Sequence, residues 1–204
     1  MKATRSLLWI LFTASLSVLA GIIAARMLAQ KTVTLQGGTW LPQSRALAQF
    51  QLSDFNGHPF ANAALRGHPT LVFFGYTSCP DVCPTTLATL RDLQHQTPLS
   101  GLQILFITVD PDRDTPAVLR QYLGSFDAGF IGLRASHDAV APLMQSLGAG
   151  AFRQDLPGDS YTLDHSATLY LLDTRGRLAA VFTPPYTPAT LAADLHAVAR
   201  ASVL

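Results

Sequence analysis

The sequence predicts an α/β fold in which a mixed β-sheet lies between helices, after a single apolar N-terminal helix. Two apolar runs rich in β-formers, at 70–76 and 102–109, are typical of central strands that are buried on both faces. Each run is followed by apolar residues at helical spacing, which favours strands joined by helices. A strand–turn–strand pattern at 168–182 then requires an antiparallel pair, so we expect a mixed sheet.

Residues 7–25 form an apolar segment of nineteen residues without a charge. As a helix this segment is about 28 Å long, close to the hydrocarbon thickness of a membrane. The basic residues before it also fit a cleaved signal peptide, but the apolar part of such a peptide is usually shorter, about 7–15 residues. We therefore expect an uncleaved transmembrane helix at 7–25 after a cytoplasmic leader at 1–6, with the bulk of the chain exported.

The segment after this helix is expected to be a tether. Residues 26–48 contain Gly37, Gly38 and Pro42 and have few apolar repeats. The folded domain is then expected to occupy residues 49–204. No internal repeat or low-complexity tract is visible in the sequence.

The order of elements within the domain favours a thioredoxin-like sandwich. The Asn-Gly pair at 56–57 predicts a turn that joins two short strands. In open sheets of this class the reactive site lies beyond the carboxyl end of a central strand. The expected elements are, in order, a hairpin at 50–60, a strand at 70–76, a helix at 85–96, a strand at 102–109, a helix from 115, a strand at 130–133, a helix at 138–147, strands at 168–172 and 178–182, and a helix at 188–199.

Two cysteines, Cys79 and Cys83, follow the first central strand in the segment GYTSCPDVCP. Pro84 is suited to the first position of a helix, which places Cys83 at the helix N-terminus and Cys79 in the preceding loop. The positive end of a helix dipole lowers the pKa of nearby thiols and favours thiolates. Two adjacent thiolates form a disulfide or share a metal ion, but a lasting metal site needs a third ligand.

His165 is the best candidate for this third ligand because it precedes a strand whose end adjoins the cysteine loop in the expected fold. Two thiolates and one imidazole favour Cu(I) in a three-coordinate site, and with an added ligand they hold Cu(II). Asp164 is a candidate for orienting the imidazole ring, and Asp110 ends the second central strand near the loop. Asp114 or Thr115 is expected to cap the following helix, and the other histidines show no partner pattern.

Composition excludes several classes of protein. Outside residues 1–31 the chain has ten arginines and thirteen aspartates, and it has no glutamate or lysine there. A mildly acidic domain without a basic stripe argues against nucleic-acid binding. Two cysteines exclude a disulfide-rich scaffold, a four-cysteine zinc site and a cysteine-held iron–sulfur cluster.

Three segments resemble the Sco (SenC) family, the thioredoxin-like copper-binding proteins of cytochrome c oxidase assembly. They are GYTSCPDVCP at 75–84, VDPDRDTP at 109–116, and DHS at 164–166 with YLLD at 170–173. The resemblance covers nearly the whole chain from about 50 to 200. One departure is Ser78, which stands where many relatives have histidine, so a possible auxiliary ligand is missing.

The resemblance implies that Cys79, Cys83 and His165 are the copper ligands. It also implies a membrane-anchored copper chaperone that helps to assemble the binuclear copper centre of the oxidase. The expected partners are the copper-centre subunit of cytochrome c oxidase, other periplasmic copper chaperones and thiol reductants. We expect a single-pass protein of the bacterial inner membrane whose domain faces the periplasm.

An alternative function uses the same two thiols. Cys79 and Cys83 would act as the redox pair of a thiol–disulfide oxidoreductase that reduces the cysteines of the oxidase copper site. A copper or redox sensor without catalysis also remains open. A peroxiredoxin-like peroxidase is disfavoured, because Thr77 is only two residues before Cys79 and no proline precedes that cysteine.

Overall fold

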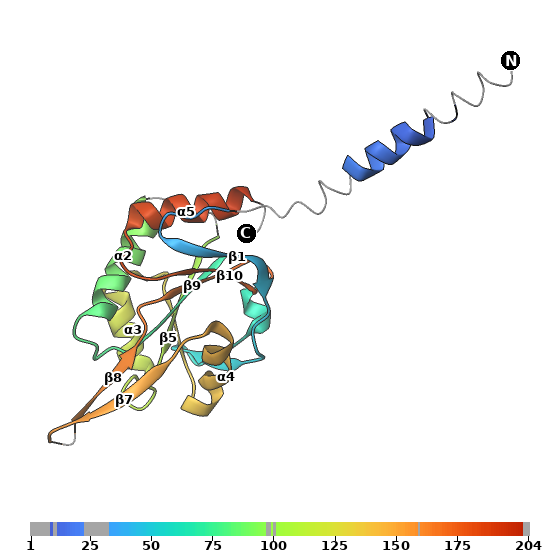
Figure 1. Ribbon diagram of the computed structural model, residues 1–204. Helices are drawn as coiled ribbons and strands as arrows, with labels where there is room; N and C mark the ends of the chain where they lie inside the picture. Colours follow the sequence, from blue (N-terminus) through green and yellow to red (C-terminus); the bar gives the residue numbers. More distant parts are fainter. Residues whose placement is uncertain are drawn as a thin grey trace, which may run out of the picture. The chain divides into compact units, whose positions relative to one another are not determined.

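The computed structural model describes residues 9, 12–22, 33–96, 99, 101–158 and 160–201. The chain divides into two compact units, Met1–Thr32 and Val33–Leu204. In the first unit residues 12–22 are helical (Figure 1), within the expected transmembrane helix at 7–25. The rest of that predicted segment, apart from Trp9, and the predicted leader lie outside the described residues. None of the helices in these described ranges is long and apolar enough to cross a membrane.

The second unit is built on an eight-stranded mixed sheet in the order β1-β10-β9-β4-β5-β6-β2-β3. The central strands β4 and β5 are parallel, and β4 pairs with β9 antiparallel, as the sequence predicts. The strands of this sheet are β1 (Gly38–Arg45), β2 (Gln51–Asp54), β3 (Pro59–Ala61), β4 (Thr70–Gly75), β5 (Gln103–Thr108), β6 (Ile131–Arg134), β9 (Leu169–Leu172) and β10 (Leu178–Phe182).

Helices lie between the strands, with apolar residues toward the core. In α2 the buried leucines are Leu87, Leu90 and Leu93, whose spacing puts them on one helix face. A hydroxyl side chain accepts a backbone hydrogen bond at the start of each of the three later helices, which fixes where each begins. The helices are η1 (Asn62–Leu65), α2 (Val82–Gln96), α3 (Pro116–Gly124), α4 (His137–Leu147) and α5 (Pro188–Arg200).

The prediction of a tether over 26–48 is wrong for its C-terminal part. Residues 38–45 form the edge strand β1, which pairs antiparallel with β10. A Cβ at Gly38 would lie 2.5 Å from the Phe182 ring, so glycine lets this backbone pack closely on the core. The sequence signal was weak because a polar edge strand with glycine and proline lacks an alternating apolar pattern. The folded unit therefore starts before residue 49, at Val33.

A second hairpin was also missed in the sequence. Strands β7 (Ala151–Leu156) and β8 (Ser160–His165) pair only with each other and form a separate two-stranded sheet. Figure 1 shows this hairpin extending away from the body of the domain. Its residues are mostly exposed and of mixed polarity, so they carry neither a strand nor a helix periodicity.

Candidate metal centre

The cysteines lie at the carboxyl end of β4, where the topology of the sheet predicts a reactive site. Helix α2 begins at Val82, two residues before Pro84, so Cys83 is in the first helical turn and Cys79 is in the loop before it. The backbone N–H of Cys79 donates to the Tyr76 carbonyl at 3.2 Å, which turns the loop toward the helix. Both thiols are free, and Cys83 is fully buried while Cys79 is 8% exposed.

A glycine makes room for the buried sulfur. A Cβ on Gly75 would lie 2.8 Å from the Cys83 Sγ and 2.8 Å from the Phe106 ring. Real Cβ atoms essentially never come this close to another heavy atom. The Cys83 sulfur and the Phe106 ring occupy the space that a side chain at position 75 would need, so glycine is the residue that fits at the end of β4.

Asp114 holds the start of the cysteine loop. Its carboxylate accepts hydrogen bonds from the Thr77 N–H at 3.1 Å, the Thr77 hydroxyl at 2.6 Å and the Thr108 hydroxyl at 2.5 Å. The side chain is fully buried, and this burial raises the pKa of the carboxyl. Of the two residues that the sequence offers as the cap of the next helix, Asp114 and Thr115, the structure shows Thr115 as the cap of α3.

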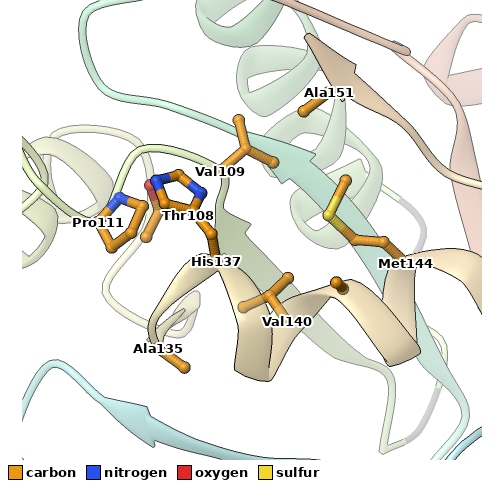
Figure 2. A pocket seen from close by; sticks show the side chains of 9 residues that line it. Thr108, Val109, Pro111, Ala135, His137, Val140, Met144 and Ala151 are labelled. Carbon is orange, nitrogen blue, oxygen red and sulfur yellow. The ribbon is translucent and has the colours of Figure 1, made fainter. Parts of the chain in front are cut away.

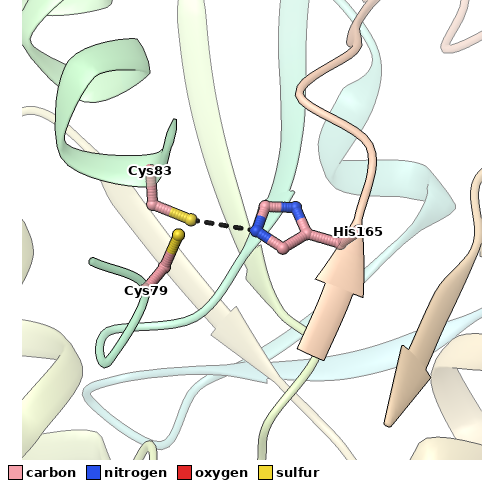
Figure 3. A group of neighbouring side chains, drawn as sticks. All are labelled: Cys79, Cys83 and His165. Carbon is pink, nitrogen blue, oxygen red and sulfur yellow. Dashed lines mark hydrogen bonds between the residues drawn. The ribbon is translucent and has the colours of Figure 1, made fainter. Parts of the chain in front are cut away.

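His165 is the last residue of β8. It lies beside the cysteines in space, although it is 82 positions from Cys83 in the sequence. Its Nε2 lies 3.2 Å from the Cys83 Sγ. A dashed line marks this contact in Figure 3. The ring makes edge contacts with the rings of Phe73 and Tyr76, at centroid distances of 6.0 and 5.6 Å. The ligand atoms of Cys79, Cys83 and His165 all lie within 4.8 Å of one another. The structure therefore brings together the three residues that were predicted from the sequence as metal ligands.

The surroundings of His165 favour a neutral ring whose Nε2 is free to bind a metal. Burial lowers the pKa of this imidazole. Its Nδ1 lies 3.3 Å from the Ser166 carbonyl oxygen, which accepts a hydrogen bond only if Nδ1 carries the proton. In the tautomer with the proton on Nδ1, the lone pair of Nε2 faces the sulfur of Cys83.

The expected activation of the thiols by the helix N-terminus is not the dominant effect at Cys83. Burial raises the pKa of this thiol far above its ordinary value, and the adjacent Cys79 and Asp114 add to the increase. The thiol of the metal-free protein is therefore protonated at neutral pH. A metal ion that binds there must displace a proton from the sulfur.

The two carboxylates expected near the site do not contact its ligand atoms. Asp164 accepts a hydrogen bond from the Gln154 amide at 2.7 Å, and it acts on the pKa of His165 only through its charge. Asp110 is buried, forms an ion pair with Arg113 and accepts a hydrogen bond from the Tyr161 hydroxyl at 2.7 Å. These contacts tie the loop after β5 to the β7–β8 hairpin.

The donor set fits copper. Two sulfurs and one imidazole nitrogen are soft or borderline ligands, and three of them suffice for Cu(I). Each residue offers one ligand atom, and the three atoms lie within 4.8 Å of one another, close enough for small side-chain movements to bring all of them to one ion. Within the described part of the chain, these residues are the only group of three or more His, Cys, Asp or Glu side chains that could hold a metal ion.

Comparisons with known proteins agree with this geometry. A family model described as SCO1/SenC matches residues 40–200. A protein of Stutzerimonas stutzeri, named for copper binding, is 39% identical over 148 residues, which are 71% of this chain and 72% of that protein. A SCO2-like protein of Rickettsia prowazekii is also 39% identical, but over 63% of this chain and 64% of its own length.

A solved structure shares both sequence and fold with the chain. ScoI of Bradyrhizobium japonicum, solved with copper bound, is 40% identical and has a TM-score of 0.67. The match covers 74% of this chain and 98% of that one. The residues matched by the family model, 40–200, include both cysteines and His165.

Proposed function

This chain belongs to the SCO1/SenC family of copper-binding proteins, and we propose that it is a chaperone that delivers copper to the binuclear centre of cytochrome c oxidase. The observation that carries the proposal is the set of three ligand atoms from Cys79, Cys83 and His165, all within 4.8 Å of one another. The role in oxidase assembly comes through the family, because a solved structure of the same fold is described as a Sco family cytochrome c oxidase assembly protein.

The arrangement of the ligands suits transfer by ligand exchange. Cys83 is fully buried, whereas the His165 ring is only half-buried and comes from a hairpin at the periphery of the domain. An incoming thiolate or imidazole from the copper-centre subunit would replace the histidine first, since that side is accessible. The two sulfurs would keep the ion bound until the acceptor supplies further ligands.

The proposal includes an anchor in the bacterial inner membrane, with the domain in the periplasm. The uncharged run at 7–25 supports it, and residues 12–22 of this run are helical. A tether of this kind restricts the search for partners to proteins of the same bilayer. Protease added to spheroplasts should degrade the domain, while intact cells should protect it. Protection in spheroplasts would contradict the periplasmic orientation.

Copper titration of the full chain tests the central claim. The reduced protein should bind one equivalent of copper with thiolate-to-copper charge-transfer absorption, and the oxidised protein should bind none, because a disulfide removes both thiolates. His165→Ala should weaken binding by more than about 100-fold, which exceeds the usual effect of losing a partner outside the ligand set. His137→Ala is the matched control, because His137 is exposed and outside the site. Unchanged affinity in His165→Ala would overturn the ligand assignment.

A second function, thiol–disulfide exchange, is favoured by the two free sulfurs lying side by side (Figure 3). In that reaction Cys79 and Cys83 would form a disulfide and give two electrons and two protons to a disulfide of the oxidase subunit, which becomes a dithiol. His165 is not needed for this step. Reduction of an oxidised partner peptide by copper-free His165→Ala protein would support the function, and no reduction by the wild type would count against it.

A further inference from the structure

The hairpin that carries His165 is attached to the domain by very few bonds. Strands β7 and β8 pair only with each other, so no backbone ladder joins them to the main sheet. Among the described residues, hydrogen bonds from the hairpin to the rest of the domain come from Tyr161, Thr162 and His165. Leu163 is the one buried side chain of the described hairpin residues.

Packing beneath the hairpin is also incomplete. A hollow of about 180 Å³ lies between α4 and the end of β5, and Figure 2 shows Ala151 of β7 and Met144 of α4 at its wall. A second hollow of about 170 Å³ is lined by Ala151, Leu163 and Tyr161 of the hairpin on one side and by Val109 on the other. Ala151 is the register partner of His165, so the hairpin is poorly filled close to its ligand. Apolar packing therefore does not fill the space between this part of the hairpin and the domain, so specific polar and aromatic contacts contribute more to holding the hairpin.

The side chain of Arg113 supplies specific contacts between the domain and the hairpin. The guanidinium of Arg113 lies 3.7 Å from the centroid of the Tyr161 ring, and its Nη1 donates to the Tyr161 carbonyl at 3.1 Å. Arg113 is itself fixed by an ion pair with the buried carboxylate of Asp110. The same carboxylate accepts a hydrogen bond from the Tyr161 hydroxyl, so the tyrosine is held at its ring, its hydroxyl and its backbone.

The same arginine reaches the histidine through a second tyrosine. Its guanidinium lies 5.7 Å from the centroid of the Tyr76 ring, and that ring makes an edge contact with His165. The Tyr76 hydroxyl is 2.9 Å from the Thr162 hydroxyl in β8. Arg113 thus touches both aromatic rings that link the cysteine side of the site to the histidine strand.

We propose that Arg113, held by Asp110, is the positioning residue of the metal centre, because it clasps the hairpin through Tyr161 and thereby keeps His165 within bonding distance of the cysteines. We call the contacts of Arg113 and Asp110 with Tyr161 the clasp. The clasp acts on His165 through strand β8, and its residues do not contact the metal ion. Tyr161 and His165 are four positions apart in the same strand, so a shift of the tyrosine moves the imidazole. This inference rests on the copper-binding function proposed above, but its effect on the hairpin is measurable without copper.

The test uses the full chain with Tyr161→Leu, which leaves the Asp110–Arg113 pair intact and removes both the ring and the hydroxyl. Copper affinity should fall by about 10- to 100-fold, as for partners that orient a ligand. The nitrogen coupling of His165 in the Cu(II) electron paramagnetic resonance spectrum should weaken while the thiolate absorption persists. In the metal-free protein, the β8 amides should exchange hydrogen faster, while those of β9 should keep their rates.

Further variants separate the clasp from general damage to the fold. Tyr161→Phe keeps the ring against the guanidinium and should restore affinity to within about threefold of wild type, a small fraction of the loss in Tyr161→Leu. Arg113→Lys keeps the charge beside Asp110 but loses the planar stack and the fork, so it should resemble Tyr161→Leu. Arg153→Gln is the matched control: Arg153 lies 3.7 Å from the other face of the Tyr161 ring but belongs to the hairpin, so it cannot tie the hairpin to the domain.

The results of these measurements distinguish a failure of the proposed role of Arg113 from a failure of the proposed copper-binding function. Unchanged amide exchange in Tyr161→Leu would overturn the clasp. Faster exchange with unchanged copper affinity and nitrogen coupling would show that the clasp does not position the ligand, which also overturns the proposal. Failure of the wild type to bind copper would instead contradict the proposed function, and the amide exchange of metal-free protein would still report on the clasp.

Discussion

The two sides of the metal centre are built differently. The cysteine side belongs to the core: Cys83 is fully buried, and the loop before Cys79 is tied to the buried carboxylate of Asp114. The histidine side belongs to a peripheral hairpin whose strand β7 is almost entirely exposed. Two ligands are thus fixed by the folding of the core, whereas the third is supplied by a hairpin that is attached to the core by its own contacts.

A consequence of this asymmetry is that mutations on the two sides should fall into different classes. On the cysteine side a change in copper affinity should come with a change in the free energy of unfolding, because the same contacts serve both. On the hairpin side, affinity should change with little loss of stability. The predictions below test this separation, beginning with the largest effect.

Asp114→Ala should be the most damaging of these changes. It removes three hydrogen bonds to a buried carboxylate and leaves the Thr77 N–H without its acceptor. We expect a loss of about 3 kcal/mol in the free energy of unfolding together with weaker copper binding, measured by chemical denaturation and by titration. Asp112→Ala is the control in the same loop, since Asp112 is 77% exposed. Loss of affinity without loss of stability would break the proposed coupling on the cysteine side.

Gly75→Ala should have the next largest effect. The new Cβ would lie 2.8 Å from the Cys83 Sγ, so the sulfur or the Phe106 ring must move. Overpacking of this kind costs about 1–3 kcal/mol, and we expect it to lower copper affinity as well because the displaced atom is a ligand. Gly124→Ala is the control, since nothing lies within 4 Å of a Cβ there. A stable variant with normal affinity would mean that the sulfur is not confined by the strand.

The pH dependence of stability should be smaller and should come from the histidine side. Burial lowers the pKa of His165 in the folded protein, so the unfolded chain takes up a proton first, near pH 6.5. This contribution to stability is complete above pH 6.5 and is lost as the pH falls through the folded-state pKa. Denaturation of metal-free protein between pH 8 and 5 measures it, with His165→Gln as the reference. An equal decline in both proteins would assign the effect to other groups.

Phe152→Ser should have the smallest effect. The Phe152 side chain is 72% exposed on β7 and faces away from the ligands, so its loss should change the free energy of unfolding by less than about 0.5 kcal/mol. Copper affinity should also stay unchanged. A clear loss of affinity would show that the outer face of the hairpin also positions His165, which would sharpen the comparison by extending the attachment beyond β8.

The sequence allowed the central fold to be predicted because its strands are apolar on both faces. The run at 70–76 and the histidine before the strand at 168 placed the cysteine loop and His165 at one end of the sheet, and the structure agrees. The hairpin at 151–165 could not be predicted, since its exposed residues show no periodicity. The sequence could not decide between Asp114 and Thr115 as the helix cap, since both residue types suit that position, and only the fold reveals that Thr77 lies beside Asp114.

The 82 positions between Cys83 and His165 also bear on how the protein is made. Synthesis proceeds from the N-terminus, so both thiols leave the ribosome long before the imidazole exists. A chain caught at that stage offers copper two sulfurs and no nitrogen. A copy that ends before residue 165 therefore lacks one of the three ligand atoms. The complete set of three ligands exists only in a chain that has been made past residue 165 and has folded.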